Sequence, residues 1–283
     1  MNLFLTGATG YIGSAVTEKL IAAGHKVAGL ARSDASAQKL QRTGALAVRG
    51  DLRDVAAIEA AARQSDGVVH LAMEFNANAP ALDRGAVDAI LAGLRGSGKL
   101  FLYTSGIWVM GNTGGHMADE STPVNPTPLV AWRPAHEKLV LEAEWVRGVV
   151  IRPAMVYGRG GGFAASFLEA GKKGVVQFVG TGENRWPFVH VDDLADLYVL
   201  ALNAAPGSVY FAAAGPSVPV RQVAERAAHG ARVDAMPVDE ARKTMGPLAD
   251  ALTLDQLVSA RKAERELGWT PKARPVLEEL ASV

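Results

Sequence analysis

Predicted strands and helices alternate along the first half of the chain. Runs rich in leucine or β-branched residues are followed by alanine-rich stretches of helical period through the first 150 residues. The expected strands are Asn2–Thr6, Lys26–Leu30, Ala45–Arg49, Gly67–Leu71, Lys99–Thr104 and Arg147–Ile151. The expected helices between them are Tyr11–Ala23, Ala35–Thr43, Asp54–Ala62, Pro80–Gly96 and Val130–Val146. Because five strand–helix units follow one another, we predict an α/β fold with a doubly wound parallel sheet and right-handed crossovers.

The second half of the chain loses this regular alternation. Glycine and proline break it into short pieces, beginning with the loop Gly158–Gly162. The elements still recognisable are a helix at Val191–Asn203, a strand at Ser208–Ala212, and helices near Val220–His229, Ala260–Leu267 and Arg274–Ala281. We predict two domains, the doubly wound domain at residues 1–153 and a smaller, irregular lobe at residues 154–283 that binds the substrate. Some strands and helices of this lobe are expected to return to the first domain.

The composition excludes several classes of protein. With 49% hydrophobic and 20% charged residues, the chain has enough apolar material for one large or two fused domains, which excludes wholesale disorder. Its 29 Lys and Arg balance 29 Asp and Glu, so no overall charge points to nucleic acid or to an anionic membrane. The lack of cysteine excludes disulfides, cysteine-bound zinc and a thiolate nucleophile. Since neither a signal segment nor a long apolar run is visible, we predict a cytoplasmic protein with no metal, no nucleic-acid partner and no membrane association.

The first strand leads directly into a glycine loop and then a helix. The segment reads Thr6-Gly7-Ala8-Thr9-Gly10-Tyr11-Ile12-Gly13-Ser14. In such a loop the first glycine allows a tight turn, the second lets the backbone approach a pyrophosphate, and the third lets the helix pack closely on the strand. The free N–H groups and the positive dipole end of the helix attract the phosphates. We therefore predict a dinucleotide-binding domain of the Rossmann type; the alternative is a glycine turn that only packs.

The end of the second strand bears on which dinucleotide binds. Sites for NAD carry an acidic residue there, about 20 residues past the loop, that holds the ribose 2′-OH. This strand ends in Ala31-Arg32-Ser33, and the first carboxylate is Asp34. Because a guanidinium fork suits a 2′-phosphate, Arg32 and Ser33 favour NADP, with NAD as the alternative. The other interpretation of Arg32 is a solvated surface charge.

Further motifs follow the glycine loop in a fixed order. They are Gly50-Asp51-Leu52, Val68-Val69-His70-Leu71-Ala72, Tyr103-Thr104-Ser105, Arg152-Pro153-Ala154-Met155-Val156-Tyr157-Gly158, Phe188–Ala195 and Glu266–Pro271. Together they make nearly the whole chain resemble the short-chain dehydrogenase/reductase superfamily, in its extended branch of NAD-dependent epimerase/dehydratase proteins. The resemblance implies that Asp51 contacts the adenine and that the segment 68–72 lines the nicotinamide side. The cofactor contacts expected in all are Gly7, Ala8, Thr9, Gly10, Tyr11, Ile12, Gly13, Arg32, Ser33, Asp51, Leu52, Leu71, Ala72, Met73, Thr104, Arg133, Pro153 and Val156.

Several residues in these motifs have simpler interpretations when taken singly. Asp51 is suited to cap the helix that follows it, and Asp192 and Asp193 are suited to begin a helix. His70 and His190 lie in apolar strand contexts, which favours hydrogen-bonded core histidines over catalytic or metal-binding ones.

The residue pair that usually carries the chemistry of this family is missing. The family uses Tyr-x-x-x-Lys on the helix before strand six, where the lysine lowers the tyrosine pKa so that the phenol relays a proton. The segment 126–137 aligns with that helix without a gap and has Leu129 at the tyrosine position and Arg133 at the lysine position. The family also uses a hydroxyl after strand five, which here is either Ser105 or lost at Gly106.

Catalysis by this chain therefore depends on other groups. Of its five tyrosines, Tyr157 is the one expected near the nicotinamide, so the predicted catalytic residues are Arg133, Ser105 and Tyr157. Arg133 stays protonated, so it is suited to anchor the nicotinamide ribose or an anionic substrate but is a poor proton donor. The alternative is a helix-surface arginine.

Other side chains near these positions have two interpretations each. His136 is either a proton donor or a histidine that packs in the helix interface, and Glu74 either meets the substrate or is solvated in its loop. Trp108, Trp132 and Phe75 are candidates for an aromatic pocket, which favours a small organic substrate over a nucleotide sugar.

Three functions fit these observations. We expect first an atypical NADP-dependent reductase that acts on a small, hydrophobic carbonyl, imine or activated alkene. The alternatives are a dinucleotide-binding sensor or interaction protein that has lost turnover, and a nucleotide-sugar epimerase or dehydratase in which Arg185 contacts a phosphate. The resemblance further implies a homodimer formed by the predicted helices Pro80–Gly96 and Val130–Val146.

Overall fold

The computed structural model describes residues 1–282 and divides into two compact units. The first unit comprises Met1–Ser105, Trp132–Ile151 and Ala195–Val209, and the second comprises Gly106–Ala131, Arg152–Leu194 and the chain from Tyr210 onward. This division differs from the predicted boundary after residue 153 mainly in residues 106–131, which belong to the second unit. Val283, the last residue of the predicted lobe, lies outside the described residues.

A seven-stranded sheet organises the first unit. Its strands are β1 (Asn2–Thr6), β2 (Lys26–Ala31), β3 (Leu46–Arg49), β4 (Gly67–His70), β5 (Leu100–Thr104), β7 (Arg147–Pro153) and β12 (Ser208–Ala212). They are ordered β12-β7-β5-β4-β1-β2-β3. The neighbouring strands from β7 to β3 in this order all pair in parallel. Because the order reverses between β1 and β4, the predicted doubly wound fold of the Rossmann type is confirmed. Ligands of such sheets bind outside the carboxyl ends of the strands at this reversal.

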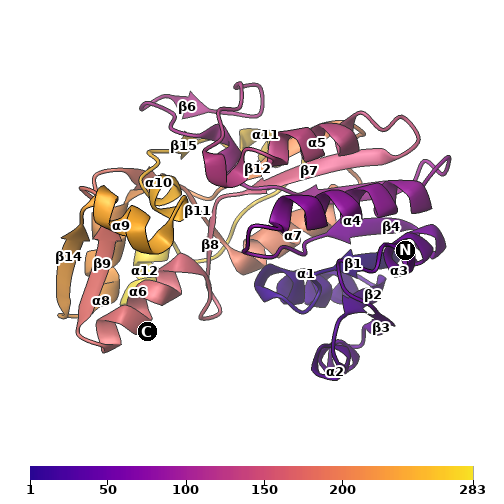
Figure 1. Ribbon diagram of the computed structural model, residues 1–283, viewed down its shortest axis with the longest axis horizontal. Helices are drawn as coiled ribbons and strands as arrows, with labels where there is room; N and C mark the ends of the chain where they lie inside the picture. The colour runs from indigo at the N-terminus through magenta and orange to yellow at the C-terminus, as the bar shows by residue number, and fades with distance from the viewer. Residues whose placement is uncertain (283) are drawn as a thin grey trace. The chain divides into compact units, whose positions relative to one another are not determined.

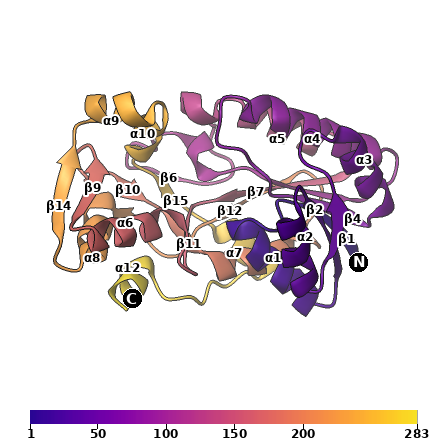
Figure 2. The ribbon, with the colours of Figure 1, turned by 60° about the horizontal axis from the view of Figure 1, so that its bottom comes forward.

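Helices cover both faces of this sheet. They are α1 (Tyr11–Ala22), α2 (Asp34–Arg42), α3 (Val55–Gln64), α4 (Ala79–Gly93), α5 (Arg133–Leu141) and α7 (Val191–Ala201). Figures 1 and 2 show α3, α4 and α5 side by side on one face, with α1 and α7 on the other. The core under α3, α4 and α5 includes Phe4, Phe101 and Tyr103 of the strands, all essentially inaccessible to solvent. Burial of both faces explains why these strands are apolar along their length.

Helix α5 is shorter than predicted at both ends. The predicted helix begins at Val130, but the observed one begins at Arg133 and ends at Leu141. Pro134 explains the late start, because proline lacks the N–H that a helix interior needs and is tolerated only in the first turn. Leu129 therefore lies in a separate turn, η2 (Pro128–Val130), and not on the helix that carries Arg133.

The second unit contains more regular structure than its sequence indicates. Its strands are β6 (Met117–Ala118), β8 (Met155–Tyr157), β9 (Val175–Val179), β10 (Arg185–Trp186), β11 (Phe188–His190), β13 (Val218–Pro219), β14 (Arg232–Met236) and β15 (Leu257–Val258). Its helices are η1 (Ile107–Met110), α6 (Gly162–Lys172), α8 (Val220–Ala228), α9 (Val238–Met245), α10 (Leu248–Leu252), α11 (Arg261–Leu267) and α12 (Val276–Ala281). An aromatic core of Phe167, Phe178, Trp186 and Phe188 holds these short pieces together. Strands β9 and β14, distant in sequence, pair in parallel.

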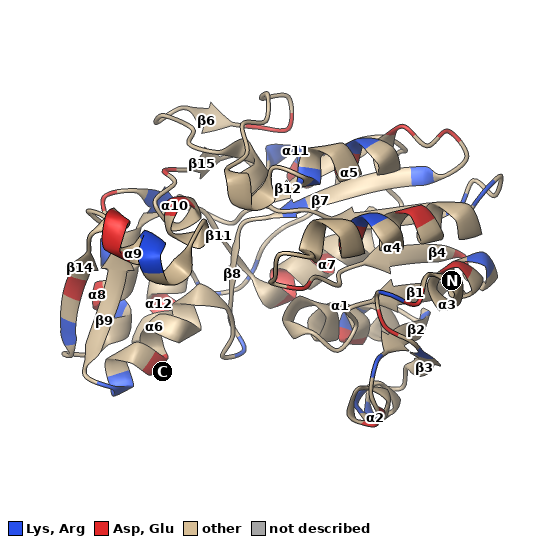
Figure 3. Cartoon of the chain, in the orientation of Figure 1, with Lys and Arg blue, Asp and Glu red and all other residues tan. Residues whose placement is uncertain are grey.

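Charges of both signs are interspersed along the elements, as Figure 3 shows for α9. In that helix Arg242 pairs with Asp239 at 2.7 Å. Exposed pairs of this kind contribute little stability. Among the described residues, no helix is long and apolar enough to cross a membrane.

Candidate functional site

The glycine loop after β1 has no room for side chains. Gly7 has a φ of 70°, and a Cβ built on it would lie 2.6 Å from the Ala72 backbone nitrogen. A Cβ on Gly13 would lie 2.0 Å from the Gly7 carbonyl oxygen. Both distances are far inside van der Waals contact, so these two glycines are required for the turn and for the close packing of α1 on β1.

The N-terminus of α1 is open to a ligand. Its N-cap is Gly10, and no side chain of the described residues 1–282 caps the helix. The first turn contains no acidic residue. No carboxylate of the first turn therefore competes with a ligand for the positive end of the helix dipole. Since the opening lies at the reversal of the strand order, the residues present fit the pyrophosphate of a dinucleotide.

The end of β2 carries positive charge. Arg32 is exposed, and its charge contributes to lowering the pKa of Glu74, whose main causes are hydrogen bonds from Asn76 and Arg53. Ser33 is the N-cap of α2, and its hydroxyl accepts from the Ser36 N–H at 3.2 Å. Ser33 thus has a structural task besides any contact with a ribose phosphate.

A second cation at this edge was not predicted from the sequence. Lys39 extends from α2, and its Nζ donates to the Thr9 carbonyl oxygen at 2.8 Å. Its ammonium group therefore lies against the glycine loop. No motif in the sequence marks Lys39, and only the observed packing of α2 brings its ammonium group to the loop.

Asp51 is not the cap of α3, because Asp54 occupies that position and accepts from the Ala57 N–H. The Asp51 carboxylate instead accepts from the Arg53 N–H at 2.7 Å. Arg53 also donates to Glu74 at 3.0 Å, and Asn76 donates to the same Glu74 oxygen. Glu74, predicted either to meet the substrate or to be solvated, is therefore held in its loop as the acceptor of both bonds.

Arg133 is brought to the carboxyl end of β5. It is only 6% exposed, and its Nη1 donates to the Thr104 carbonyl oxygen at 3.0 Å. Its Nη2 donates to the Met73 sulfur at 2.8 Å, and its guanidinium lies 4.7 Å from the centre of the Trp132 ring. Arg133 is thus a buried permanent cation joined to two predicted cofactor contacts, and not a helix-surface arginine.

Ser105 lies beside this contact and has an unused hydroxyl. It is 7% exposed, its N–H donates to the Ile151 carbonyl, and its Oγ has no hydrogen-bond partner among residues 1–282. Its neighbour Thr104 is satisfied by the Tyr198 hydroxyl at 2.6 Å. Because a buried polar atom without a partner is costly, the unused hydrogen-bonding capacity of the Ser105 hydroxyl is the feature of this strand end that calls for an explanation.

Tyr157 does not suit the predicted catalytic role. It lies in β8 of the second unit, is 3% exposed, and its hydroxyl donates to the Arg274 carbonyl oxygen at 2.5 Å. Burial, reinforced by the nearby Asp193 charge, raises the pKa of Tyr157 well above its ordinary value. A phenol whose hydrogen is already donated and whose ionised form is disfavoured is a poor proton relay.

The remaining predicted residues are divided between the units. Pro153 ends β7 and Val156 lies in β8, both in the second unit. Trp108 also belongs to the second unit, where its ring packs near Phe163. Phe75 belongs to the first unit and is 93% exposed. Neither unit by itself contains the predicted aromatic pocket.

Both strand histidines are hydrogen-bonded core residues, as predicted. His70 is 1% exposed and contacts Asp83 and Thr6, and His190 is 8% exposed and accepts from the Asp192 N–H. Asp192 and Asp193 lie in the first turn of α7. Asp193 also accepts from the Lys272 N–H at 2.9 Å, which gives it a structural task.

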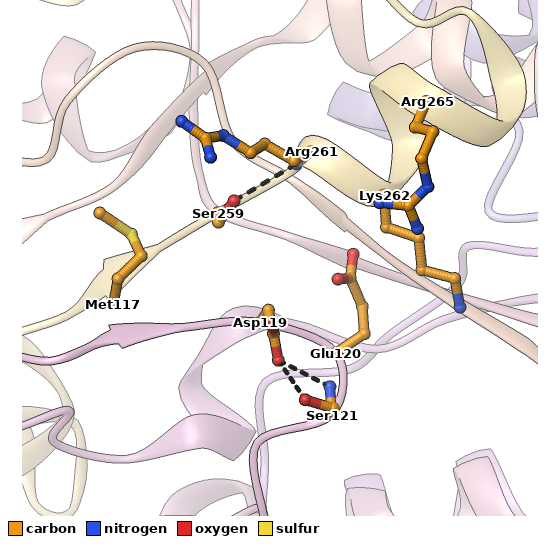
Figure 4. Close-up of a pocket in the computed structure, with 8 residues that line it drawn as sticks. All are labelled: Met117, Asp119, Glu120, Ser121, Ser259, Arg261, Lys262 and Arg265. Carbon is orange, nitrogen blue, oxygen red and sulfur yellow. Dashed lines mark hydrogen bonds between the residues drawn. The ribbon is translucent and has the colours of Figure 1, made fainter.

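An open pocket of about 540 Å³ lies within the second unit, between the segment after β6 and α11 (Figure 4). Three of its polar residues have partners within the same unit. Asp119 accepts from Ser121, Glu120 accepts from the Phe211 N–H at 2.8 Å, and Lys262 lies over the Tyr210 ring. None of the predicted catalytic or cofactor residues lines this pocket.

Comparison with known proteins agrees with the geometry of the loop and sheet. The model of the NAD dependent epimerase/dehydratase family matches residues 3–213. The uncharacterized protein C2A9.02 of Schizosaccharomyces pombe is 34% identical over 100% of this chain and 99% of its own length. A 2-alkyl-3-oxoalkanoate reductase of Stenotrophomonas maltophilia is 30% identical over 83% of this chain and 78% of its own. The Thermus thermophilus UDP-glucose 4-epimerase, solved with NAD, superposes with a TM-score of 0.82 at 24% identity, covering 99% of this chain and 97% of that one. The chain belongs to the NAD-dependent epimerase/dehydratase family, whose members are NAD(P)-dependent oxidoreductases, epimerases and dehydratases.

Proposed function

We propose that the protein is an NADP-dependent reductase of the atypical short-chain dehydrogenase/reductase type, acting on a small, hydrophobic carbonyl, imine or activated alkene. The observation that carries the proposal is the pair of groups at the end of β5. There a buried guanidinium holds the Thr104 carbonyl, and the next residue, Ser105, offers a buried hydroxyl with no partner among residues 1–282.

The chemistry of hydride transfer belongs to the nicotinamide when it is bound. The chain's own residues orient and polarise the acceptor. Ser105 is suited to donate a hydrogen bond to the acceptor's oxygen or nitrogen, and Arg133 supplies fixed positive charge where negative charge develops. Neither group readily gives up a proton.

The missing phenol bears on the choice of substrate. A positioned general acid is worth about a hundred- to ten-thousand-fold in rate. An iminium ion accepts hydride without needing a proton at the reacting atom, and an activated alkene takes its proton at a carbon that solvent reaches later. We therefore expect imines and enones to be reduced faster than simple ketones.

Preference for NADP rests on Arg32 and Lys39. Arg32 follows β2 directly, and Lys39 lies against the glycine loop, so two cations flank the region where a ribose 2′-phosphate is expected. Arg32→Ala should raise the KM for NADPH about tenfold or more and change that for NADH little. Equal changes for both coenzymes would refute the preference.

The name of one relative adds a substrate to test. A 3-oxo acid carries a carboxylate two carbons from its ketone, as the relative's name 2-alkyl-3-oxoalkanoate reductase indicates. A guanidinium binds a carboxylate well, so Arg133 is compatible with such a substrate. 3-Oxo acids are therefore among the substrates to be tested.

The proposal is tested by incubating the purified protein with NADPH and a panel of imines, enones, ketones and 3-oxo acids. Loss of absorbance at 340 nm with at least one class supports a reductase. Tight NADPH binding with no consumption supports the alternative of a sensor without turnover.

Interconversion of nucleotide sugars would support the second alternative, an epimerase or dehydratase. Arg185, the candidate phosphate contact of that alternative, donates through Nε and Nη2 to both oxygens of Asp255 at 2.8 and 2.6 Å. The fork that would bind a phosphate is therefore already occupied by a carboxylate.

A further inference from the structure

A buried carboxylate in the first unit receives three hydrogen bonds from three different elements. Asp83 of α4 is 5% exposed. His136 of α5 contacts its Oδ2 through Nδ1 at 2.7 Å, the Tyr103 hydroxyl of β5 donates to the same oxygen at 2.8 Å, and His70 of β4 contacts its Oδ1 through Nε2 at 3.2 Å.

One branch of this network ends at the glycine loop. The two ring nitrogens of His70 contact different partners, Nε2 the Asp83 carboxylate and Nδ1 the Thr6 Oγ1 at 2.7 Å. When Nε2 donates to Asp83, Nδ1 is the acceptor for the Thr6 hydroxyl. The Thr6 oxygen in turn accepts from the N–H groups of Leu71 and Ala72, both at 3.3 Å. Every polar atom along this branch therefore has a partner of the right kind. We call Asp83, His70 and Thr6 the His70 branch.

The end of the His70 branch fixes backbone that the proposed cofactor site uses. Thr6 is the last residue of β1 and precedes Gly7. Ala72, which Thr6 binds, is the residue against which Gly7 is packed without room for a Cβ. The position of the Ala72 backbone therefore sets the position of the turn that opens α1.

The other branch ends at the helix that carries Arg133. His136 lies one turn after Arg133 on α5, and its ring packs 4.9 Å from that of Trp132. Helix α5 has only nine residues, and a helix so short depends on contacts outside itself for its position. The bond from His136 to Asp83 joins the first turn of α5 to α4. We call Asp83 and His136 the His136 branch.

Burying a carboxylate such as that of Asp83 costs desolvation free energy, which apolar side chains do not. Apolar side chains of similar volume often stabilise a protein as well as or better than a buried ionic group. A carboxylate with directional partners does what apolar packing does not, because it fixes the orientation of each element that contacts it.

We propose that Asp83 is a positioning residue that holds the two halves of the proposed site in register, the glycine loop through the His70 branch and Arg133 through the His136 branch. The inference rests on the proposed function for the role of Arg133. It predicts that the two branches affect different steps. Breaking the His70 branch weakens dinucleotide binding, and breaking the His136 branch slows turnover while dinucleotide binding stays near that of the unaltered protein.

The test compares variants that break one branch each. His70→Phe keeps the ring that stacks on Tyr103 but removes the bonds to Asp83 and Thr6. His136→Phe keeps a ring beside Trp132 but removes the bond to Asp83. We expect His70→Phe to raise the Kd for NADPH about tenfold or more, and His136→Phe to lower kcat by a similar factor with the Kd for NADPH within about twofold. His136→Asn, whose amide can take the place of Nδ1, should recover most of kcat.

The matched control is Tyr103→Phe, which takes one donor from the same carboxylate and belongs to neither branch. It should lower the melting temperature and leave both the Kd for NADPH and kcat near those of the unaltered protein. If His70→Phe fails to fold, Thr6→Val interrupts the same branch at its far end and should also raise the Kd.

Hydrogen exchange separates this inference from the proposed function, because it needs no substrate. His70→Phe should speed amide exchange in residues 71–76, and His136→Phe should speed it in residues 132–137, each without the other. If the protein reduces nothing in the panel but shows this separation, the proposed function is refuted and the positioning role of Asp83 is supported. Equal effects of both variants on both segments and on NADPH binding, or no effect of either, would overturn the inference.

Discussion

Gly10→Ala separates ligand binding at the glycine loop from folding of the loop. Gly10 has φ −72° and ψ −179°, a conformation that any residue adopts. A Cβ there would lie 3.1 Å from the Gly7 carbonyl oxygen, so the neighbour needs to shift only by a few tenths of an ångström. The new methyl group would stand at the opening of α1, where the pyrophosphate is expected to approach the backbone.

The two consequences differ in size. Alanine is a poorer N-cap than glycine but restricts the unfolded chain, and the two effects, each about 0.5 to 1 kcal/mol, oppose one another. We therefore expect the melting temperature to change by only a few degrees. A methyl group that holds the phosphates off the N–H groups costs at least one charged hydrogen bond, about 1.5 to 3 kcal/mol, which raises the Kd for NADPH by about ten- to a hundredfold.

The assay is a calorimetric titration of NADPH into the unaltered protein, Gly10→Ala and a control, with a thermal melt of each. Gly85→Ala is the control, because Gly85 lies within α4 and a Cβ there meets its nearest neighbour at 3.9 Å. It should bind NADPH like the unaltered protein. A folded Gly10→Ala protein that binds NADPH as tightly as the unaltered protein would refute the proposed approach of the phosphates to this loop.

Three further predictions follow from the same geometry. Arg133→Met should lower kcat/KM by about ten- to a hundredfold on any substrate the panel reveals, and Arg133→Lys should restore little of it because an ammonium cannot reach both Thr104 and Met73; full activity of Arg133→Lys would contradict the role of the fork. Asp83→Asn should lower the free energy of unfolding by about 3 kcal/mol at pH 7. Burial would raise the pKa of Asp83, but hydrogen bonds from His136 and His70 outweigh it and hold that pKa well below its ordinary value. The stability that the ionised carboxylate contributes is therefore complete above the unfolded pKa of about 4 and is lost as the pH falls below that value. In urea unfolding, the difference in free energy of unfolding between the unaltered protein and Asp83→Asn should shrink below that pH; a difference that stays constant would contradict this prediction. Sedimentation should give a homodimer formed through α4 and α5, about twice the chain mass of 29.7 kDa; a mass of 29.7 kDa would exclude it.

The first unit was predictable because its signals are local. The glycine loop, the buried strands and their spacing are written in consecutive residues, so the strands are found within a residue or two and the family follows from the order of the motifs. The exception is α5. The apolar period suggests a start at Val130, but Pro134 outweighs the period and moves the start to Arg133.

The second unit was less predictable because its pairings are not local. Strand β9 finds its partner β14 more than fifty residues later, and neither segment alternates strongly enough to identify itself. The sequence also did not reveal that the Tyr157 hydroxyl is engaged, since its partner is the carbonyl of Arg274, which no motif marks. Lys39 and Asp83 were missed because their importance lies in what α2 and α4 pack against.

Dinucleotide binding at the glycine loop is measured by calorimetric titration of the purified protein with NADPH and with NADH. We expect one binding site per chain, with NADPH bound more tightly than NADH. No binding heat from either coenzyme, in a protein that melts cooperatively, would contradict it.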